Sequence, residues 1–286
     1  MTSLKNLVKA AHSGHELVVT GPHTEWIEME ETQQIYSDAA IEHVRKALKR
    51  EYKVARIGRF SPSSVGKCSR RLAYGYAGAP QIPFDIDTTE IVDHGTWTHL
   101  KWQAEGLTMG YMTGVEQWIE DADLMIGGST DASLYDESVF ELKSAAPSVF
   151  SRVVLTNGAP MEENLDQATI YMMLLGADWT SLVYEDRAYG GFHEFRIQMD
   201  SHRERRLIKL LTRLRAMVEA DELPEPLDDC VMRQGKVFKG CPYRKVCHKL
   251  NTVSEARAAG NVDPETVHQF GGGSFTWPSE DPGGLL

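Results

Sequence analysis

The order of the predicted elements indicates an α/β protein in which helices flank a mixed central sheet. Short apolar runs bounded by turn residues predict strands, and longer runs with apolar residues every three or four positions predict helices. A strand pair is followed by a helix, a second strand pair and a further helix, as in a layered α/β domain. The 286 residues are enough for one large domain with appendages.

Several segments carry a helical pattern. The segment 33–52 has apolar residues at helical spacing and basic residues on its other side. Ser61 and Pro62 predict a helix start, because serine caps helices and proline is tolerated in a first turn. Further helices are expected at 93–107, at 163–175 with Gly176 as its end, and at 202–220.

The strands are expected in two groups. The first comprises 115–119, 124–134 and 138–143, and a polar turn at Asp136 and Glu137 joins the last two. The second is the hairpin "SLVYEDRAYGGFHEFRIQM", which turns at its adjacent glycines.

The chain divides into three predicted parts. Residues 1–58 form an N-terminal helical extension, although the first 30 or so residues show no sustained period. Residues 59–250 form the core. Residues 251–286 are polar and glycine-rich, which predicts a disordered tail.

Composition sets limits on location and partners. With 42% hydrophobic and 25% charged residues, no apolar run of membrane-spanning length and no secretory signal, a cytoplasmic protein with no membrane partner is expected. The net charge of −11 argues against a nucleic-acid partner, yet basic residues crowd the segments 45–71 and 203–215. Such runs are also typical of solvated helix faces.

An acid and a lysine stand two positions apart in the strand sequence "FELKS". Because side chains alternate along a strand, Glu141 and Lys143 are expected on one face, with Asp131 beside them across the hairpin. Two close carboxylates select a hard cation such as Mg²⁺ or Mn²⁺, and a lysine can orient a metal-bound water. Taken alone, the three residues are also typical of a surface hairpin with an ordinary ion pair.

Other polar residues accompany this group. The glycines of "IGGSTD" allow a close backbone approach to a ligand. His99 and Gln103 share one helix face, and Gln167 and Tyr171 share another, each pair at i, i+4. Each pair alone is more typical of a structural position.

This series, in this order, resembles the RecB-like branch of the PD-(D/E)XK nuclease superfamily. The pattern of that family is G-x-x-x-H on a helix, then G-G-x-x-D, E-x-K and Q-x-x-x-Y. The resemblance spans roughly residues 60 to 250 and implies a restriction-endonuclease-like fold. The matching residues are Gly95, His99, Gly127, Gly128, Asp131, Glu141, Leu142, Lys143, Gln167 and Tyr171.

The resemblance implies roles for these residues. Lys143 would be the catalytic base or a water-orienting group, and Gln167 and Tyr171 would position the lysine and the DNA backbone. The implied Mg²⁺ or Mn²⁺ ligands are His99, Asp131, Glu141 and the carbonyl of Leu142. The implied catalytic set is Asp131, Glu141, Lys143, Gln167 and Tyr171. From the basic segments we expect phosphate contacts by Arg70, Arg71, Arg203 and Arg206.

The four cysteines indicate a metal site, because disulfides are rare in cytoplasmic proteins. The chain lacks the C-x-x-C knuckle of structural zinc sites, and the surrounding basic residues favour a charged iron–sulfur cluster. Zinc and buried unligated thiols are the alternatives. The cysteines are Cys68, Cys230, Cys241 and Cys247.

The segments "SPSSVGKCSRRLAYGY" and "CPYRKVC" resemble those of four-cysteine RecB-like nucleases, namely the exonucleases of CRISPR adaptation, their phage relatives and the AddB nuclease domain. That resemblance implies a 4Fe–4S cluster that joins the two ends of the core. Cys230 departs from the spacing of the CRISPR-associated enzymes.

Together these resemblances imply a divalent-metal-dependent DNA exonuclease. It would prefer single-stranded ends, act from 5′ to 3′, and serve recombination, repair or end processing in a bacterial, archaeal or phage-infected cell. The chain has no G-x-x-x-x-G-K-[ST] motor motif. A structure- or sequence-directed endonuclease and a non-catalytic iron–sulfur DNA-binding protein are the rivals. A second copy of the chain, or recombination or CRISPR proteins, are the candidate protein partners.

Overall fold

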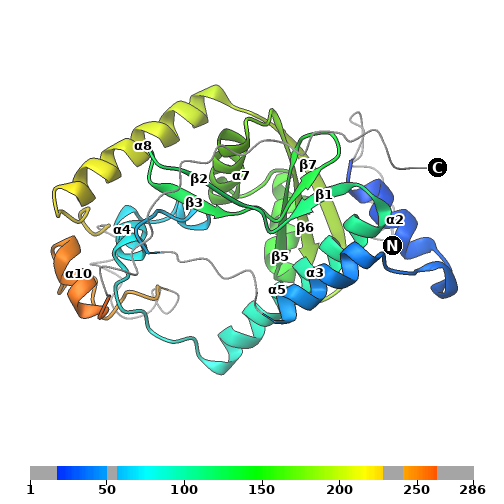
Figure 1. Ribbon diagram of the computed structural model, residues 1–286, viewed down its shortest axis with the longest axis horizontal. Helices are drawn as coiled ribbons and strands as arrows, with labels where there is room; N and C mark the ends of the chain where they lie inside the picture. Colours follow the sequence, from blue (N-terminus) through cyan, green and yellow to red (C-terminus); the bar gives the residue numbers. More distant parts are fainter. Residues whose placement is uncertain (1–17, 50–56, 228–240, 263–286) are drawn as a thin grey trace.

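The structure, a computed structural model, describes residues 18–49, 57–227 and 241–262 (Figure 1). Its main sheet has five strands in the order β1-β4-β5-β6-β7. β5 and β6 run parallel and the other neighbours run antiparallel, so the mixed central sheet is confirmed. The strands are β1 (Met112–Val115), β4 (Ala132–Leu134), β5 (Val139–Ala145), β6 (Trp179–Asp186) and β7 (Phe192–Gln198).

A separate two-stranded ribbon lies beside the main sheet. It consists of β2 (Trp118–Asp121) and β3 (Ile126–Ser129). The single strand expected at 124–134 is therefore wrong, because the chain leaves the ribbon after Ser129 and enters the main sheet at Ala132. The break places Asp131 between the two sheets, outside both hydrogen-bond ladders.

Helices cover both faces of the main sheet, as the α/β class requires. Phe140 and Leu142 of β5 pack against Trp102 of α5 (Ile86–Met109). Val139, on the opposite face of the same strand, packs with Tyr171 of α7 (Glu162–Leu175). Because Glu141 and Lys143 have the same parity as Val139, their side chains point toward α7.

The N-terminal helices lie on the α5 side of the sheet (Figure 1). α3 (Asp38–Leu48) packs along α5, and α2 (Thr20–Glu28) contacts α5 and β7. The sequence showed no period at α2, since this helix is held by tertiary contacts: the Glu194 carboxylate of β7 accepts hydrogen bonds from the first amides of the helix.

Three helices form the opposite end of the molecule (Figure 1). These are α4 (Ser69–Ala77), α8 (Ser201–Glu219) and α10 (Val253–Ala259), which share one hydrophobic cluster. The expected disorder from residue 251 is wrong for residues 251–262. Thr252 and Glu255 form a capping box at the start of α10, and Val253 and Ala256 are buried. Residues 263–286 lie outside the described residues.

Two helix starts differ from expectation. Pro62 opens only a 3₁₀ turn, Pro62–Ser64, and α4 begins after Cys68. α5 begins at Ile86 rather than at 93, because the Asp85 side chain caps it through the Thr88 amide. The remaining short helices are the 3₁₀ turn Glu31–Gln33, α6 (Pro147–Phe150) and the π-helix Ser151–Asn157. No helix within the described ranges is long and apolar enough to span a membrane.

Candidate active site

Glu141 and Lys143 contact each other on the α7 side of β5. The Lys143 Nζ atom donates to Glu141 Oε1 at 2.6 Å, as the strand period predicts. Gln167, from the second turn of α7, closes the group: its Oε1 accepts from Lys143 Nζ at 2.8 Å and its Nε2 donates to Glu141 Oε1 at 2.8 Å. The three side chains therefore fix one another in a triangle of hydrogen bonds.

Tyr171 lies one turn after Gln167 and reaches the ribbon. Its hydroxyl donates to the Ser129 carbonyl at 2.7 Å. Burial, reinforced by the Glu141 and Asp131 charges, raises the pKa of Tyr171 well above its ordinary value, so the hydroxyl remains a donor. α7 thus holds the end of β3 and the side chains of β5 in fixed relation.

Asp131 lies against the edge of β5. β4 pairs with β5 only as far as Phe140, which leaves the Leu142 amide without a strand partner on that side. The Asp131 carboxylate takes its place, with Oδ2 accepting from the Leu142 N–H at 2.7 Å. Its other oxygen, Oδ1, lies 3.1 Å from Nδ1 of His99 on α5.

These residues open onto one cleft of about 510 Å³, here called the β5 cleft. Its walls come from α5, β2, β3, β5, α7 and the turn around Pro62. Of the sequence-predicted site, it brings together His99, Asp131, Glu141, Leu142, Lys143, Gln167 and Tyr171.

The two adjacent glycines serve packing inside the protein. A Cβ on Gly127 would lie 2.9 Å from the Trp118 ring, and one on Gly128 would lie 2.9 Å from Pro62 and 3.1 Å from the Tyr171 hydroxyl. A side chain on Gly128 would push the ribbon off α7, and one on Gly127 would displace the Trp118 ring of the same ribbon. The contacts therefore explain the glycines without the ligand that the sequence suggested.

The carboxyl groups of Asp131 and Glu141 differ in pKa. Burial alone would raise the pKa of Asp131, but the His99 charge outweighs it and lowers the pKa. Burial alone would lower the pKa of His99, but Asp131 raises it to about 9. The pair is therefore an imidazolium and a carboxylate at neutral pH. Burial and the Asp131 charge, opposed by Lys143, raise the pKa of Glu141 to about 7.

Lys143 is held in its charged form. Burial alone would lower its pKa, but Glu141 and Asp131 outweigh burial and raise it. A lysine that keeps its proton donates hydrogen bonds and neutralises nearby negative charge. In this geometry Lys143 is a charged hydrogen-bond donor to Glu141 and Gln167.

The donors of the cleft suit a hard divalent cation. Glu141 Oε2 is buried and accepts no hydrogen bond within the described part of the chain, and it belongs to a carboxylate close to Asp131. Carboxylate and carbonyl oxygens are the donors that Mg²⁺ and Mn²⁺ prefer. No group of three or more His, Cys, Asp or Glu side chains in residues 18–49, 57–227 and 241–262 surrounds a common metal position, and His99 Nδ1 contacts Asp131. The fit therefore rests on the oxygen donors.

The cleft also contains residues that sequence reasoning missed. Glu116 and Lys67 line it, as does Arg59, whose guanidinium lies 4.4 Å from the centre of the Trp118 ring. Burial, together with the charges of Arg71 and Lys143, lowers the pKa of Lys67. None of these residues belongs to the matched motif; the position of Arg59 and Lys67 in the basic segment 45–71 is the one sequence signal that could have suggested them.

The structure does not support the phosphate contact expected at Arg70. Arg70 is buried, and its guanidinium donates to the carbonyls of Pro224, Cys247 and Leu250. It is therefore a structural residue, and the expectation that it contacts DNA is not supported by its position.

Arg203 and Arg206 of α8 both bind the buried Asp166 carboxylate of α7, and Arg203 also binds Glu162. These charges join α8 to α7, so they are already neutralised by acids. Arg206 is nevertheless exposed, and Arg71 is only partly buried, so these two remain the accessible members of the predicted set.

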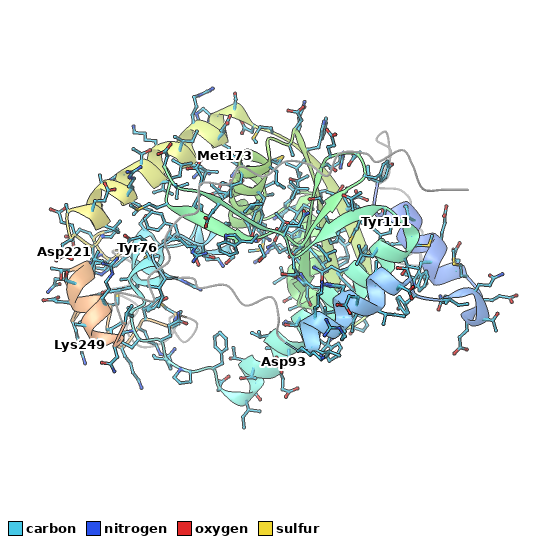
Figure 2. The ribbon with its side chains drawn as sticks, in the orientation of Figure 1. Tyr76, Asp93, Tyr111, Met173, Asp221 and Lys249 are labelled. Carbon is cyan, nitrogen blue, oxygen red and sulfur yellow. The ribbon has the colours of Figure 1, made fainter. Side chains whose placement is uncertain are left out.

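Three of the four cysteines are described, and all three are partly buried. Cys68 is the N-cap of α4, and the Arg70 and Tyr74 side chains of α4 bind the Cys247 carbonyl. The segment with Cys241 and Cys247 is thus tied to the helix that follows Cys68. Cys230 lies outside the described residues. Figure 2 shows Tyr76 of α4 and Lys249 at this same end of the molecule.

Comparisons with known proteins give structural likenesses only. No family model matches the sequence. No curated protein matches it. Among solved structures, the chain is similar to an alkaline exonuclease (LHK-Exo) from Laribacter hongkongensis, free and in complex with dAMP. Each shows 20% identity, a TM-score of 0.46 and coverage of 60% of this chain and 93% of that chain. It is also similar to SSO0001, with 17% identity, a TM-score of 0.43 and coverage of 73% and 95%.

Proposed function

We propose that this protein is a divalent-metal-dependent deoxyribonuclease, specifically an exonuclease that degrades single-stranded DNA from the 5′ end. The observation that carries the proposal is the constellation of the β5 cleft. It comprises a buried carboxylate with an unused oxygen, a second carboxylate at the strand edge, and a charged lysine fixed between Glu141 and Gln167. Such a set suits hydrolysis of a phosphodiester.

The residues present assign the roles. Asp131, Glu141 and the Leu142 carbonyl would hold Mg²⁺ or Mn²⁺, which supplies Lewis acidity and an activated water when bound. Lys143 orients the attacking water and stabilises negative charge on the phosphate. Gln167 fixes the lysine, Tyr171 fixes the ribbon, and His99 fixes the Asp131 carboxylate.

Substrate attraction falls to the cations of the cleft wall. Lys67 is exposed and lines the cleft, and the partly buried Arg71 follows three residues after the N-cap of α4. Phosphate contacts of this kind position a strand without selecting sequence. They support a nuclease without base specificity over a sequence-directed endonuclease.

We further propose that the four cysteines bind a 4Fe–4S cluster, with zinc as the alternative. Support comes from the contact between the Cys247 segment and α4, which follows Cys68, and from the partial burial of all three described thiols. A cluster there would join residues distant in sequence. Cys230 would supply the fourth thiolate.

The decisive experiment compares DNA substrates. Purified protein with Mn²⁺ or Mg²⁺ is incubated with end-labelled linear single strands, linear duplexes and closed single-stranded circles, and with a Lys143→Ala variant as control. Loss of label from the linear single strand, absent in the variant, supports the proposal. Early cutting of circles supports the endonuclease, and tight binding without cleavage supports a non-catalytic DNA-binding protein.

A further inference from the structure

Gln103 forms hydrogen bonds through both polar atoms of its side-chain amide, behind the β5 cleft. It lies on α5, one turn after His99, and only 1% of it is exposed. Its Nε2 donates to the Asp131 carbonyl at 2.8 Å and to Glu116 Oε1 at 3.0 Å. Its Oε1 lies 2.9 Å from Nε2 of His43. One amide thus contacts three separate segments of the chain.

The donors and acceptors fix the orientation of this amide. Two acceptors face the Gln103 nitrogen, so its oxygen must face His43, and His43 must donate through Nε2. A flipped amide would place its oxygen against two other oxygens. His43 is buried on α3, so the Gln103 oxygen is held in this orientation by a contact from the N-terminal extension.

Both acceptors belong to irregular backbone that lines the cleft. Asp131 lies in the break between β3 and β4, outside either ladder. Glu116 lies between β1 and β2 with φ of 50°, in the left-handed region that non-glycine residues adopt at a cost. The Glu116 amide also donates to the Asp131 carbonyl, at 3.4 Å. Gln103 therefore adds two hydrogen bonds to a pair of irregular segments that are otherwise joined by the Glu116–Asp131 and Thr130–Gln117 backbone contacts.

We propose that Gln103 and His43 are positioning residues for the nuclease site. Gln103 fixes the backbone of Asp131, and the fixed backbone keeps the carboxylate on the Leu142 amide and on His99. His43 fixes Gln103, which makes α3 part of the active-site scaffold rather than an appendage. The expected effect on DNA cleavage rests on the proposed function. The expected effect on the contact between Asp131 and the Leu142 amide rests on geometry alone.

The test uses four variants of the full chain. Gln103→Met keeps length and flexibility but removes both polar atoms. His43→Leu removes the donor to Gln103, and His43→Gln restores a donor from a side-chain amide. Thr108→Val is the matched control, because the Thr108 hydroxyl accepts from the Ser37 amide at 3.1 Å in the same α3–α5 interface, away from the cleft.

Two readouts are measured for each folded variant. Steady-state cleavage of linear single-stranded DNA should show kcat lower by about 10- to 100-fold in Gln103→Met and His43→Leu, with KM changed by less than about threefold. His43→Gln should recover most of kcat, and Thr108→Val should keep it. Hydrogen exchange of peptides within 139–145 should be faster in the first two variants, because the Leu142 amide loses its acceptor.

The outcomes separate the two proposals. If the wild type cleaves no DNA, the proposed function fails, and the exchange of the β5 peptides still tests the positioning role. Wild-type kcat and unchanged exchange in Gln103→Met would overturn that role. It would also be overturned if Thr108→Val lowered kcat as much as His43→Leu at equal loss of thermal stability, since α3 would then act only through general stability.

Discussion

Asp131 Oδ2 accepts a hydrogen bond from the Leu142 amide at 2.7 Å, so a side chain completes the edge of β5 where β4 stops. The same contact brings the carboxylate next to Glu141 and the carbonyl of Leu142. One residue thus completes the strand edge and carries a role in the proposed active site. Substitution of Asp131 would disturb the strand as well as the chemistry, and cleaner tests of the site lie on its neighbours.

Lys143→Met and Glu141→Gln should each lower cleavage of single-stranded DNA by at least about 100-fold, since they remove the charged group and a buried carboxylate of the proposed site. DNA affinity should change little, because the substrate-facing cations remain. Cleavage rates and fluorescence-anisotropy titrations measure both quantities. Near-normal cleavage by either variant would show that the active site lies elsewhere in the protein.

The His99–Asp131 pair predicts a loss of stability in alkali. The pKa of His99 is raised from 6.5 to about 9, so its contribution is complete below pH 6.5 and is lost as the pH rises through about 9. The loss is at most about 3 kcal/mol in the free energy of unfolding. Urea unfolding at pH 6 and pH 9 in EDTA should show it. His99→Gln should flatten this dependence; an equal slope in that variant would contradict the ion pair.

Divalent ions should reverse part of this trend. Burial and Asp131 raise the pKa of Glu141 to about 7, so the folded protein without metal favours the protonated acid below neutrality. Metal binding needs the carboxylate. Addition of Mn²⁺ should therefore raise the melting temperature more at pH 8 than at pH 6, and this difference should vanish in Glu141→Gln. A metal shift independent of pH would exclude Glu141 as a ligand.

Protein purified without oxygen should contain about four iron and four sulfide per chain, as a Cys₄-ligated cubane requires. Cys68→Ser should lose the brown colour of the cluster. This variant should also unfold at a lower urea concentration. Metal analysis and unfolding curves measure these effects. Stoichiometric zinc without sulfide would show that the cysteines bind zinc instead of an iron–sulfur cluster.

Arg70 should matter for stability rather than for DNA affinity. Arg70→Met leaves the carbonyls of Pro224, Cys247 and Leu250 without their donors, which should cost about 2–4 kcal/mol in the free energy of unfolding. Arg71→Met, its neighbour on the accessible side, should instead weaken DNA binding and leave stability nearly unchanged. The reverse pattern in urea unfolding and anisotropy would contradict this division of roles.

Sequence reasoning predicted the parts of the site that depend on local period. Glu141 and Lys143 share a strand face, and Gln167 and Tyr171 share a helix face, because these spacings follow from backbone geometry alone. The polar tail at 251–262 was misjudged because burial of two residues and one capping box sufficed for a short helix.

The remaining features depend on contacts between distant segments. Nothing near residue 131 predicts that a strand breaks there, since the break is held by Gln103 from α5. Likewise, the identity of Arg70 cannot distinguish a DNA contact from a structural ion whose acceptors lie 154 to 180 residues later. The sequence shows which residues are basic, but only the tertiary fold shows whether a basic side chain is buried against carbonyls or accessible to DNA.

The position of those acceptors has a consequence for biosynthesis. While the chain is emerging from the ribosome, Arg70 and Tyr74 lack the carbonyl acceptors of Cys247 and Leu250 until residues 247–250 have been translated. A nascent chain that stops earlier would have to bury the Arg70 guanidinium with part of its acceptors missing or leave this side of α4 open to proteases. Completion of α4 packing therefore follows translation of residues up to Leu250, and prematurely terminated chains should be degraded faster than the full chain.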